Sequence, residues 1–367
     1  MNIGIDISQI VYTGTGVARF TRGLVDAIVS YDTENTWTFF FSSFRQKIPT
    51  DVYNKINKSN HKLVCKHIPP TLLGVLWNDR PFWSHAMNNS LLKWTQKLDW
   101  FITSDWAEAP ALCKKATIVH DLVFRCFPET VHPLIIKTQE KRLERVVNES
   151  NVIFADSHTT KKDLQEFFSI KKADIMVNYP GVKKMQLTVT HDVLAKYDLK
   201  KPFILTVGKL EPRKNMSRLI EAVRGMNVML IVVGIEGWGE ANNHQTHNKN
   251  VRFLGFVSDE DLSALYSKAT IFVFPSLYEG FGYPIVEAMQ HYCPVIASNT
   301  SSLAEIAKDA ALLCDPTDVQ NIKQTIEQLL ADTKLQQTLS EKGKQRAAKF
   351  SWKTYYNTLI KALGNET

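Results

Sequence analysis

The 367-residue sequence has little cysteine, and the cysteines it has lie far apart. Their positions show neither the close pairs of a disulfide framework nor the Cys/His spacing of a zinc site. Disulfides form and persist in oxidising compartments, so scattered thiols of this kind are typical of a cytoplasmic protein. We therefore expect reduced cysteines, a cytoplasmic location and no cysteine-bound metal. The five are Cys65, Cys113, Cys126, Cys293 and Cys314.

Long apolar runs are also missing, since none approaches the roughly 20 residues of a membrane-spanning helix. The chain starts with Met1–Ile7, which already reads as a β-strand, so we expect no signal peptide before it. Residues 1–180 carry 22 Lys and Arg against 18 Asp and Glu, and the remainder carries 22 against 19. This even excess of positive charge gives no basic tail for nucleic acid. It suits phosphate-bearing ligands or an anionic membrane surface.

Strand and helix patterns alternate throughout, which is typical of parallel sheets covered by helices. The length is comfortable for two domains. The first α/β pattern covers residues 1–182, and the polar stretch 183–201 is predicted to be a linker. A second α/β pattern covers residues 202–348, and a final amphipathic helix lies within 349–367. The sequence therefore predicts an α/β protein with two parallel sheets.

The most informative stretch joins a strand, a turn and a helix. Ile271–Phe274 is apolar, β-branched and aromatic, as in a buried parallel strand. Gly280 and Gly282 allow the following backbone to bend, and a helix then begins near Pro284. Glu279 lies in the turn and Glu287 in the helix. Ligands of parallel α/β sheets bind at this end of a strand. A solvated loop and helix is the alternative, but the apolar flanks argue against it.

Other strand ends in the second half carry complementary groups. Lys209, Arg213 and Lys214 crowd the loop after one strand, where cations can clamp a phosphate, although solvated side chains are the alternative. Residues 255–257 form a turn suited to a flat ring, and a helix N-terminus at 302–305 suits a phosphate. Phosphates, a ring and hydroxyls together describe a nucleotide-sugar.

Two features of the first half are weaker signals. Gly14-Thr15-Gly16 precedes a helix and can bind an anion, but it is not a complete GxGxxG and an ordinary tight turn would look the same. His120 leaves a buried strand, as a general base or a substrate-orienting residue would, or as a hydrogen-bonded structural histidine would.

No metal site is predicted. Ser258–Asp261 resembles a DxD motif, but a helix cap with Ser258 as N-cap and Asp261 reaching back explains it better. His244 and His247 lack a third ligand, so we assign them to the surface.

Residues 72–106 hold five of the eight tryptophans, with basic residues between them. This segment is either core or a surface for an amphipathic acceptor or a lipid interface.

With these motifs, the chain resembles the retaining glycosyltransferases of family 4, over nearly its whole length. The resemblance rests on Glu279-x7-Glu287, on residues 207–215, on the His120-Asp121 pair, on the glycine loop 14–16 and on residues 350–352. It implies the GT-B fold, in which two Rossmann-like domains face each other across a cleft. The donor would lie mainly on the second domain and the acceptor on the first, and the last helix would cross back to the first.

The resemblance also implies roles for individual residues. His120, Lys214 and Glu279 would be catalytic, and sugar configuration would be retained without a metal or other cofactor. Lys209 stands where the family usually has arginine, so it keeps the charge but loses the fork geometry. The implied donor-binding residues are Gly14, Gly16, Lys209, Arg213, Phe256, Val257, Phe281, Gly282, Glu287, Ser302 and Leu303.

Residues 208–215 resemble the variant common among mannosyltransferases of bacterial polysaccharide and O-antigen assembly. This implies GDP-mannose as donor and a glycan or lipid-linked oligosaccharide as acceptor, at the inner face of the cytoplasmic membrane. UDP-glucose, UDP-N-acetylglucosamine and dTDP-rhamnose remain alternative donors. A sugar-nucleotide epimerase or a phosphorylase-like enzyme on the same fold, or a non-catalytic scaffold, are alternative classes. The presence of His120, Lys214, Glu279 and Glu287 argues against a scaffold.

Overall fold

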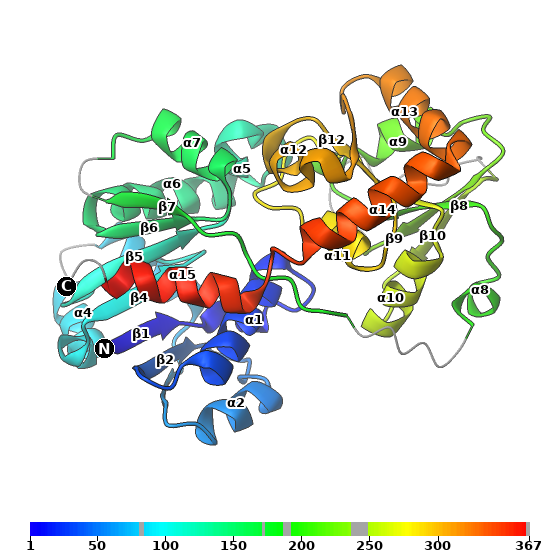
Figure 1. The fold of residues 1–367 in the computed structure, drawn as a ribbon. Helices are drawn as coiled ribbons and strands as arrows, with labels where there is room; N and C mark the ends of the chain where they lie inside the picture. Colours follow the sequence, from blue (N-terminus) through cyan, green and yellow to red (C-terminus); the bar gives the residue numbers. More distant parts are fainter. Residues whose placement is uncertain (81–83, 171–172, 186–191, 236–248, 365–367) are drawn as a thin grey trace. The chain divides into compact units, whose positions relative to one another are not determined.

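A computed structural model of the chain describes residues 1–80, 84–170, 173–185, 192–235 and 249–364. The chain divides into two compact units (Figure 1). Unit 1 comprises Met1–Gly181 and Ser351–Thr367, and unit 2 comprises Val182–Phe350.

Unit 1 is built on a seven-stranded parallel sheet with the strand order β3-β2-β1-β4-β5-β6-β7. Its strands are β1 (Asn2–Asp6), β2 (Thr36–Ser42), β3 (Lys62–Lys66), β4 (Trp100–Ser104), β5 (Lys114–Val119), β6 (Val152–Ala155) and β7 (Asp174–Val177). Its helices are α1 (Gly16–Tyr31), α2 (Thr50–Asn57), α3 (Pro70–Gly74), α4 (Ser84–Leu92), α5 (Val123–Cys126), α6 (Pro133–Glu149), α7 (His158–Phe167) and α15 (Trp352–Gly364).

Unit 2 is built on a six-stranded parallel sheet with the order β10-β9-β8-β11-β12-β13. Its strands are β8 (Phe203–Val207), β9 (Met229–Val233), β10 (Val251–Gly255), β11 (Ile271–Phe274), β12 (Val295–Ser298) and β13 (Leu312–Cys314). Its helices are α8 (Val193–Lys196), α9 (Met216–Ala222), α10 (Asp259–Lys268), α11 (Tyr283–Gln290), α12 (Ser301–Ala307), α13 (Val319–Ala331) and α14 (Thr333–Ala347).

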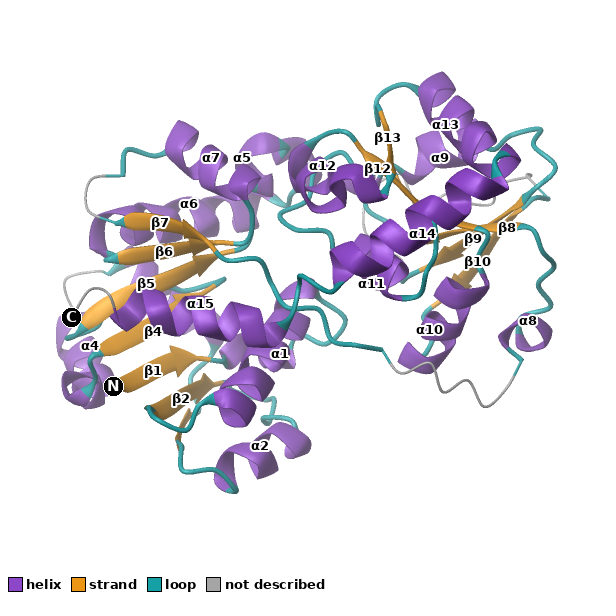
Figure 2. Ribbon diagram, in the orientation of Figure 1, coloured by secondary structure: helices purple, strands orange, loops and turns teal. Residues whose placement is uncertain are grey.

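The predicted α/β class with two parallel sheets is confirmed. Figure 2 shows the strands of each sheet running side by side in one direction, with helices against them. Strands buried on both faces read as continuous apolar runs, which is why Ile271–Phe274 and Phe203–Val207 were recognisable from the sequence.

The last helix, α15, belongs to unit 1 although it follows the whole of unit 2 in the chain. Trp352 at its start packs against α1, where a Cβ atom added at Gly23 would lie 2.1 Å from the indole ring. The ring of Phe20 contacts Trp352 and Tyr355 edge to face, and the Asn178 amide donates to the Tyr355 carbonyl at 3.1 Å. Aromatic burial of this kind therefore anchors the C-terminal helix on α1.

The stretch 183–201, predicted as a linker, contains α8 in its described part. Lys196 and Tyr197 contact the carboxylate of Asp261 on α10, at 2.6 and 2.9 Å. This segment therefore lies against unit 2. Ser258 caps α10 as predicted, since its hydroxyl accepts from the Asp261 amide at 3.1 Å.

The aromatic segment 72–106 contributes to the core of unit 1. Trp77 and Trp100 are fully buried, and Trp94 packs against Phe40 and Phe101. Trp83 lies outside the described residues. No helix in the described ranges is long and apolar enough to cross a membrane.

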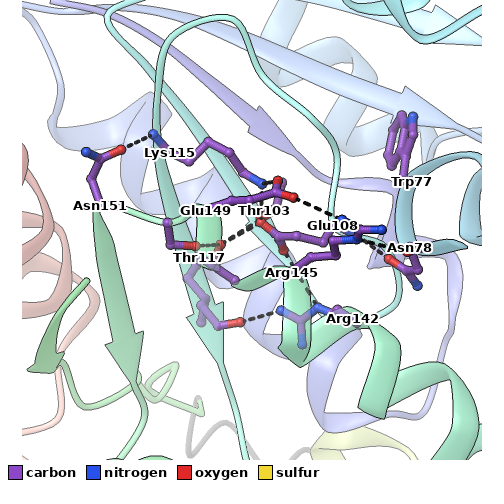
Figure 3. A network of polar contacts seen from close by, with 12 residues as sticks. Trp77, Asn78, Thr103, Glu108, Lys115, Thr117, Arg142, Arg145, Glu149 and Asn151 are labelled. Atoms are coloured by element: carbon purple, nitrogen blue, oxygen red, sulfur yellow. Dashed lines mark hydrogen bonds and ion pairs between the residues drawn. The ribbon is translucent and has the colours of Figure 1, made fainter. Parts of the chain in front are cut away.

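A buried ionic network ties the loop after β4 to β5 and α6 in unit 1 (Figure 3). Glu108 is fully buried, and Lys115 lies 2.7 Å from one of its oxygens and Arg142 4.0 Å from the other. The hydroxyls of Thr103 and Thr117 donate to the same carboxylate at 2.8 and 2.9 Å. Buried charges persist only when paired and hydrogen-bonded, as they are here.

Candidate active site

A dense polar cluster of unit 2 lies on the loop between β11 and α11. Gly282 caps α11 with a φ of 99°, a conformation that favours glycine. A Cβ atom at this position would also lie 2.5 Å from Cδ2 of Leu303, so glycine permits the close approach of α12. Pro284 then lies in the first turn of α11, as predicted. Local chain geometry thus places the turn 279–282, which is largely buried, at the carboxyl edge of the sheet.

Glu279 is held by two cations from the loop after β8. Its carboxylate lies 2.5 Å from Nζ of Lys214 and 2.9 Å from Nη1 of Arg213. The Ser276 hydroxyl donates to the same carboxylate at 2.6 Å. Strand β8 pairs with β11, and this pairing brings two loops that are 65 residues apart in the chain together. Three of the residues selected from the sequence therefore form one cluster.

The electrostatics of this cluster keep Glu279 ionised. Burial alone would raise the pKa of Glu279, but Arg213 and Lys214 lower it to about 2. The pKa of Lys214 is lowered, mainly because the side chain is buried. Glu279 raises this pKa, and the charge of Arg213 lowers it. The loop adds Glu211, which pairs with Lys209 at 3.1 Å. Three cations and two carboxylates leave a net positive charge suited to an anionic ligand.

Helix α12 is tied to the same turn. Ser301 accepts from the Glu279 amide at 3.2 Å, and Ser302 donates to the Glu279 carbonyl at 2.8 Å. Ser302 and Leu303 are both fully buried. The structure therefore brings Gly282, Ser302 and Leu303 together with Glu279. Phe281 is also close in sequence, but its ring is buried against Phe350, which leaves its backbone as the part next to the cluster.

The remaining residues selected in unit 2 differ in exposure. Phe256 follows β10 and is 78% exposed, the largest exposure among the exposed large hydrophobic side chains, whereas Val257 is buried. Glu287 is buried in α11 and accepts from the Tyr266 hydroxyl at 3.1 Å. Exposed aromatic rings are available for stacking, and buried carboxylates need hydrogen-bond donors.

Sequence reasoning missed two residues that shape this site, Ser276 and Gly208. Ser276 is fully buried behind Glu279, and nothing in its sequence context separates it from an ordinary loop serine. Gly208 and Gly234 end neighbouring strands, and a Cβ atom at Gly234 would lie 1.9 Å from the Gly208 carbonyl oxygen. The side chain of Lys214 passes close to Gly208, at 3.6 Å from where a Cβ atom would stand. Gly208 could have been selected from the sequence, because a glycine follows each of two predicted strands, at Gly208 and Gly234.

The residues selected in unit 1 lie at the carboxyl edge of its sheet. Gly14 has a φ of 82°, and a Cβ atom at Gly16, the first residue of α1, would meet no neighbouring atom within 4 Å. His120 follows β5, and its Nδ1 lies 2.7 Å from Oδ2 of Asp156. Asp6 ends β1 nearby, and burial raises its pKa to about 6 despite two hydrogen bonds from Ser8. Across the described ranges, no group of three or more His, Cys, Asp and Glu side chains is placed to hold a metal ion.

Comparisons with known proteins bear on what this arrangement does. Residues 193–346 match the family described as "Glycosyl transferases group 1". The chain is 31% identical to O-antigen chain mannosyltransferase B of Escherichia coli, across 99% of both chains. It is 27% identical to O-antigen chain mannosyltransferase RfbU of Salmonella typhimurium, across 60% of this chain and 62% of that one.

Among solved structures, sucrose-phosphate synthase from Thermosynechococcus elongatus superposes with a TM-score of 0.73 at 18% identity, across 100% of both chains. This likeness shows the GT-B fold, and the full-length similarity to a glycosyltransferase shows the family. The chain therefore belongs to the group 1 glycosyltransferases, family 4, which are retaining hexosyltransferases of the GT-B fold.

Proposed function

We propose that this enzyme transfers mannose from GDP-mannose to a glycan or lipid-linked oligosaccharide in the synthesis of a cell-envelope polysaccharide. The observation that carries the proposal is the full-length similarity to an O-antigen mannosyltransferase, joined to the cluster of Glu279, Lys214 and Arg213. The mannosyltransferase name recurs in a second O-antigen relative.

In this proposal the cluster binds the reacting part of the donor. Glu279 accepts hydrogen bonds from sugar hydroxyls, for which its ionised carboxylate is suited. Lys214 and Arg213, with Lys209, neutralise the diphosphate and the charge that grows on it as it leaves. The sugar passes through an oxocarbenium-like state, and the acceptor hydroxyl attacks from the face that the diphosphate leaves. The departing phosphate takes the acceptor proton, so configuration is retained.

The other residues contact the rest of the donor and the acceptor. Glu287 binds the ribose, and Phe256 and Val257 border the base. The backbones of Phe281 and Gly282 approach the sugar. His120 lies by the sugar and acceptor. Gly14 belongs to the glycine loop before α1, and the residues whose backbones approach the phosphates are Gly16, Ser302 and Leu303.

We further propose that the enzyme works as a peripheral protein on the inner face of the cytoplasmic membrane, where lipid-linked acceptors lie. Phe44, Leu72 and Val75 are exposed apolar side chains in the segments after the neighbouring strands β2 and β3. Arg45 and Lys47 add positive charge beside Phe44. Trp77 is buried and therefore takes no part in such a contact.

A thermal-shift comparison of GDP, UDP and dTDP tests the donor. A nucleotide that binds only the folded protein stabilises it, by about 2.7 kcal/mol at 100 times its dissociation constant. We expect GDP to raise the melting temperature most, and GDP-mannose to do the same. Stabilisation by UDP or dTDP but not GDP would contradict the proposed donor. The Glu279→Gln variant should still respond to GDP while losing transfer, because Glu279 contacts sugar and not base.

Replacing Phe256 with alanine is expected to weaken GDP binding. An aromatic platform for a base contributes about 1–3 kcal/mol, so the dissociation constant should rise roughly 5- to 150-fold. The melting temperature of the free protein should not change, since the ring is 78% exposed. Isothermal titration calorimetry measures the affinity, with Leu313→Ala as a control for losing an exposed apolar side chain. An affinity within twofold of the parent would show that Phe256 does not border the base.

A further inference from the structure

His120 and Asp156 form a closely enclosed pair at the carboxyl edge of the sheet in unit 1. They follow the adjacent strands β5 and β6, whose last residues, Val119 and Ala155, are paired in register. Nδ1 of His120 lies 2.7 Å from Oδ2 of Asp156, and the two side chains are 15% and 5% exposed. The Phe20 ring of α1 lies edge-on to the imidazole, 4.6 Å between centroids. The imidazole is therefore held from two sides.

The hydrogen bond determines which ring nitrogen faces a ligand. A carboxylate only accepts hydrogen bonds, so the Nδ1–H group of His120 donates and Oδ2 of Asp156 accepts. The other nitrogen, Nε2, is buried and has no hydrogen-bond partner within the part of the chain that the structure describes. Buried polar atoms in folded proteins are nearly always paired. A ligand atom that hydrogen-bonds to Nε2 would satisfy this nitrogen.

The charges around the ring favour its protonated form. Asp156 from the end of β6 is closest, Asp105 follows β4 and Asp121 follows His120 itself. The charge of Arg142 on α6 acts on Asp105. Burial lowers the pKa of His120, but the three carboxylates outweigh it and raise the pKa overall. With both nitrogens protonated, Nε2 is a hydrogen-bond donor.

We propose that Asp156 is a positioning residue that holds His120 as an imidazolium, so that Nε2–H donates to an oxygen of the bound sugar or acceptor. The inference rests on the proposed function in placing His120 beside those substrates. It also restricts the role of His120. An imidazolium that donates through Nε2 cannot accept the acceptor proton, so His120 orients substrate and the departing phosphate remains the base.

The expected pH dependence of kcat/KM follows from the raised pKa of His120. A histidine whose pKa is raised in the folded protein keeps its proton to higher pH and loses it as pH rises through the folded value. Replacing Asp156 with asparagine removes the nearest negative charge, so the donor form should be lost at lower pH. At pH values above the pKa of His120 in both the parent and the variant, kcat/KM of the variant should be lower by about tenfold for each unit by which the substitution lowers that pKa.

The Asp156→Asn variant tests the proposal by two independent measurements. The first is ¹⁵N NMR titration of histidine-labelled protein without substrate, with His120→Gln to assign the resonances. We expect Nδ1 to be protonated in the parent, and the titration of His120 to move to lower pH in the variant. The second is kcat/KM against pH, where the deficit should be largest at alkaline pH and narrow as the pH is lowered.

Asp174→Asn is the matched control, because Asp174 is an exposed carboxylate of the same unit at the opposite end of the sheet. It should alter neither measurement. If Asp156→Asn does not fold, Asp156→Glu replaces it in the test. This variant keeps a carboxylate, so the pKa of His120 should remain partly raised. An unchanged His120 titration, or an activity loss equal at every pH, would overturn the proposal. The NMR titration needs no donor, so a wrong donor assignment would leave its outcome intact.

Discussion

Replacing Lys214 with alanine is expected to lower kcat about 100-fold or more, the scale of losing one donor that stabilises charge in a transition state. The Lys214 ammonium is mostly buried, 2.5 Å from Glu279 and 5.1 Å from the centre of the Phe274 ring. A cation enclosed in this way interacts more strongly with a departing diphosphate than one in water. The loss should appear in kcat more than in KM, because leaving-group charge grows only during reaction.

The variant should remain folded, which makes the kinetic result interpretable. Glu279 keeps Arg213 at 2.9 Å and the Ser276 hydroxyl at 2.6 Å, so its carboxylate stays paired after Lys214 is shortened. Steady-state transfer with saturating donor measures kcat, and a thermal melt checks folding. Lys342→Ala is a suitable control, since Lys342 is an exposed lysine of the same unit that pairs only with the exposed Asp309 at 3.1 Å among the contacts described. Near-normal turnover of Lys214→Ala would remove Lys214 from the catalytic machinery.

Replacing Glu108 with alanine is expected to destabilise unit 1 by about 3 kcal/mol, the lower end of the range for breaking a buried ion pair. The change leaves Arg142 enclosed without its carboxylate partner, and the buried hydroxyls of Thr103 and Thr117 lose one acceptor, although they still contact each other at 3.0 Å. Two contacts of the cations limit this loss of stability. Lys115 keeps Glu149 at 3.2 Å, and Arg142 still donates to the Ile118 carbonyl at 3.0 Å.

Denaturant unfolding followed by tryptophan fluorescence measures this effect in unit 1. All tryptophans except Trp238 belong to that unit, so the signal reports on it and not on the whole chain. Asp51→Ala is the matched control within unit 1, because Asp51 forms an exposed pair with Arg22 that contributes less than about 1 kcal/mol. A loss in Glu108→Ala as small as that of the control would mean that the buried network is not a main support of unit 1.

The fold was predictable because buried parallel strands leave a clear pattern in the sequence. The run Ile271–Phe274 and the following Gly282 and Pro284 were enough to place a strand, a turn and a helix, and the structure has them there. The final helix was expected to return to the first domain only through the family resemblance, since its amphipathic pattern does not say which unit it covers.

Pairs of side chains were much harder to predict than single residues. Lys214 and Glu279 were each selected, but their contact depends on β8 lying beside β11, and the apolar patterns of the strands do not specify their order. His120 was also selected, whereas Asp156 was not, and their contact depends on β5 lying beside β6, the strands that they directly follow. Glu108 was not selected at all, because one glutamate among alanines and a proline reads as an exposed loop.

The central claim is that the cluster around Glu279 serves a retaining transfer of mannose from GDP-mannose. The most direct measurement offers the enzyme GDP-mannose, UDP-glucose, UDP-N-acetylglucosamine and dTDP-rhamnose with a lipid-linked oligosaccharide acceptor, and analyses the product by NMR. We predict that only GDP-mannose gives product, with the new mannose in the α configuration of the donor, and that Glu279→Gln gives almost none. Product from a UDP- or dTDP-sugar alone, or an inverted β linkage, would contradict the account.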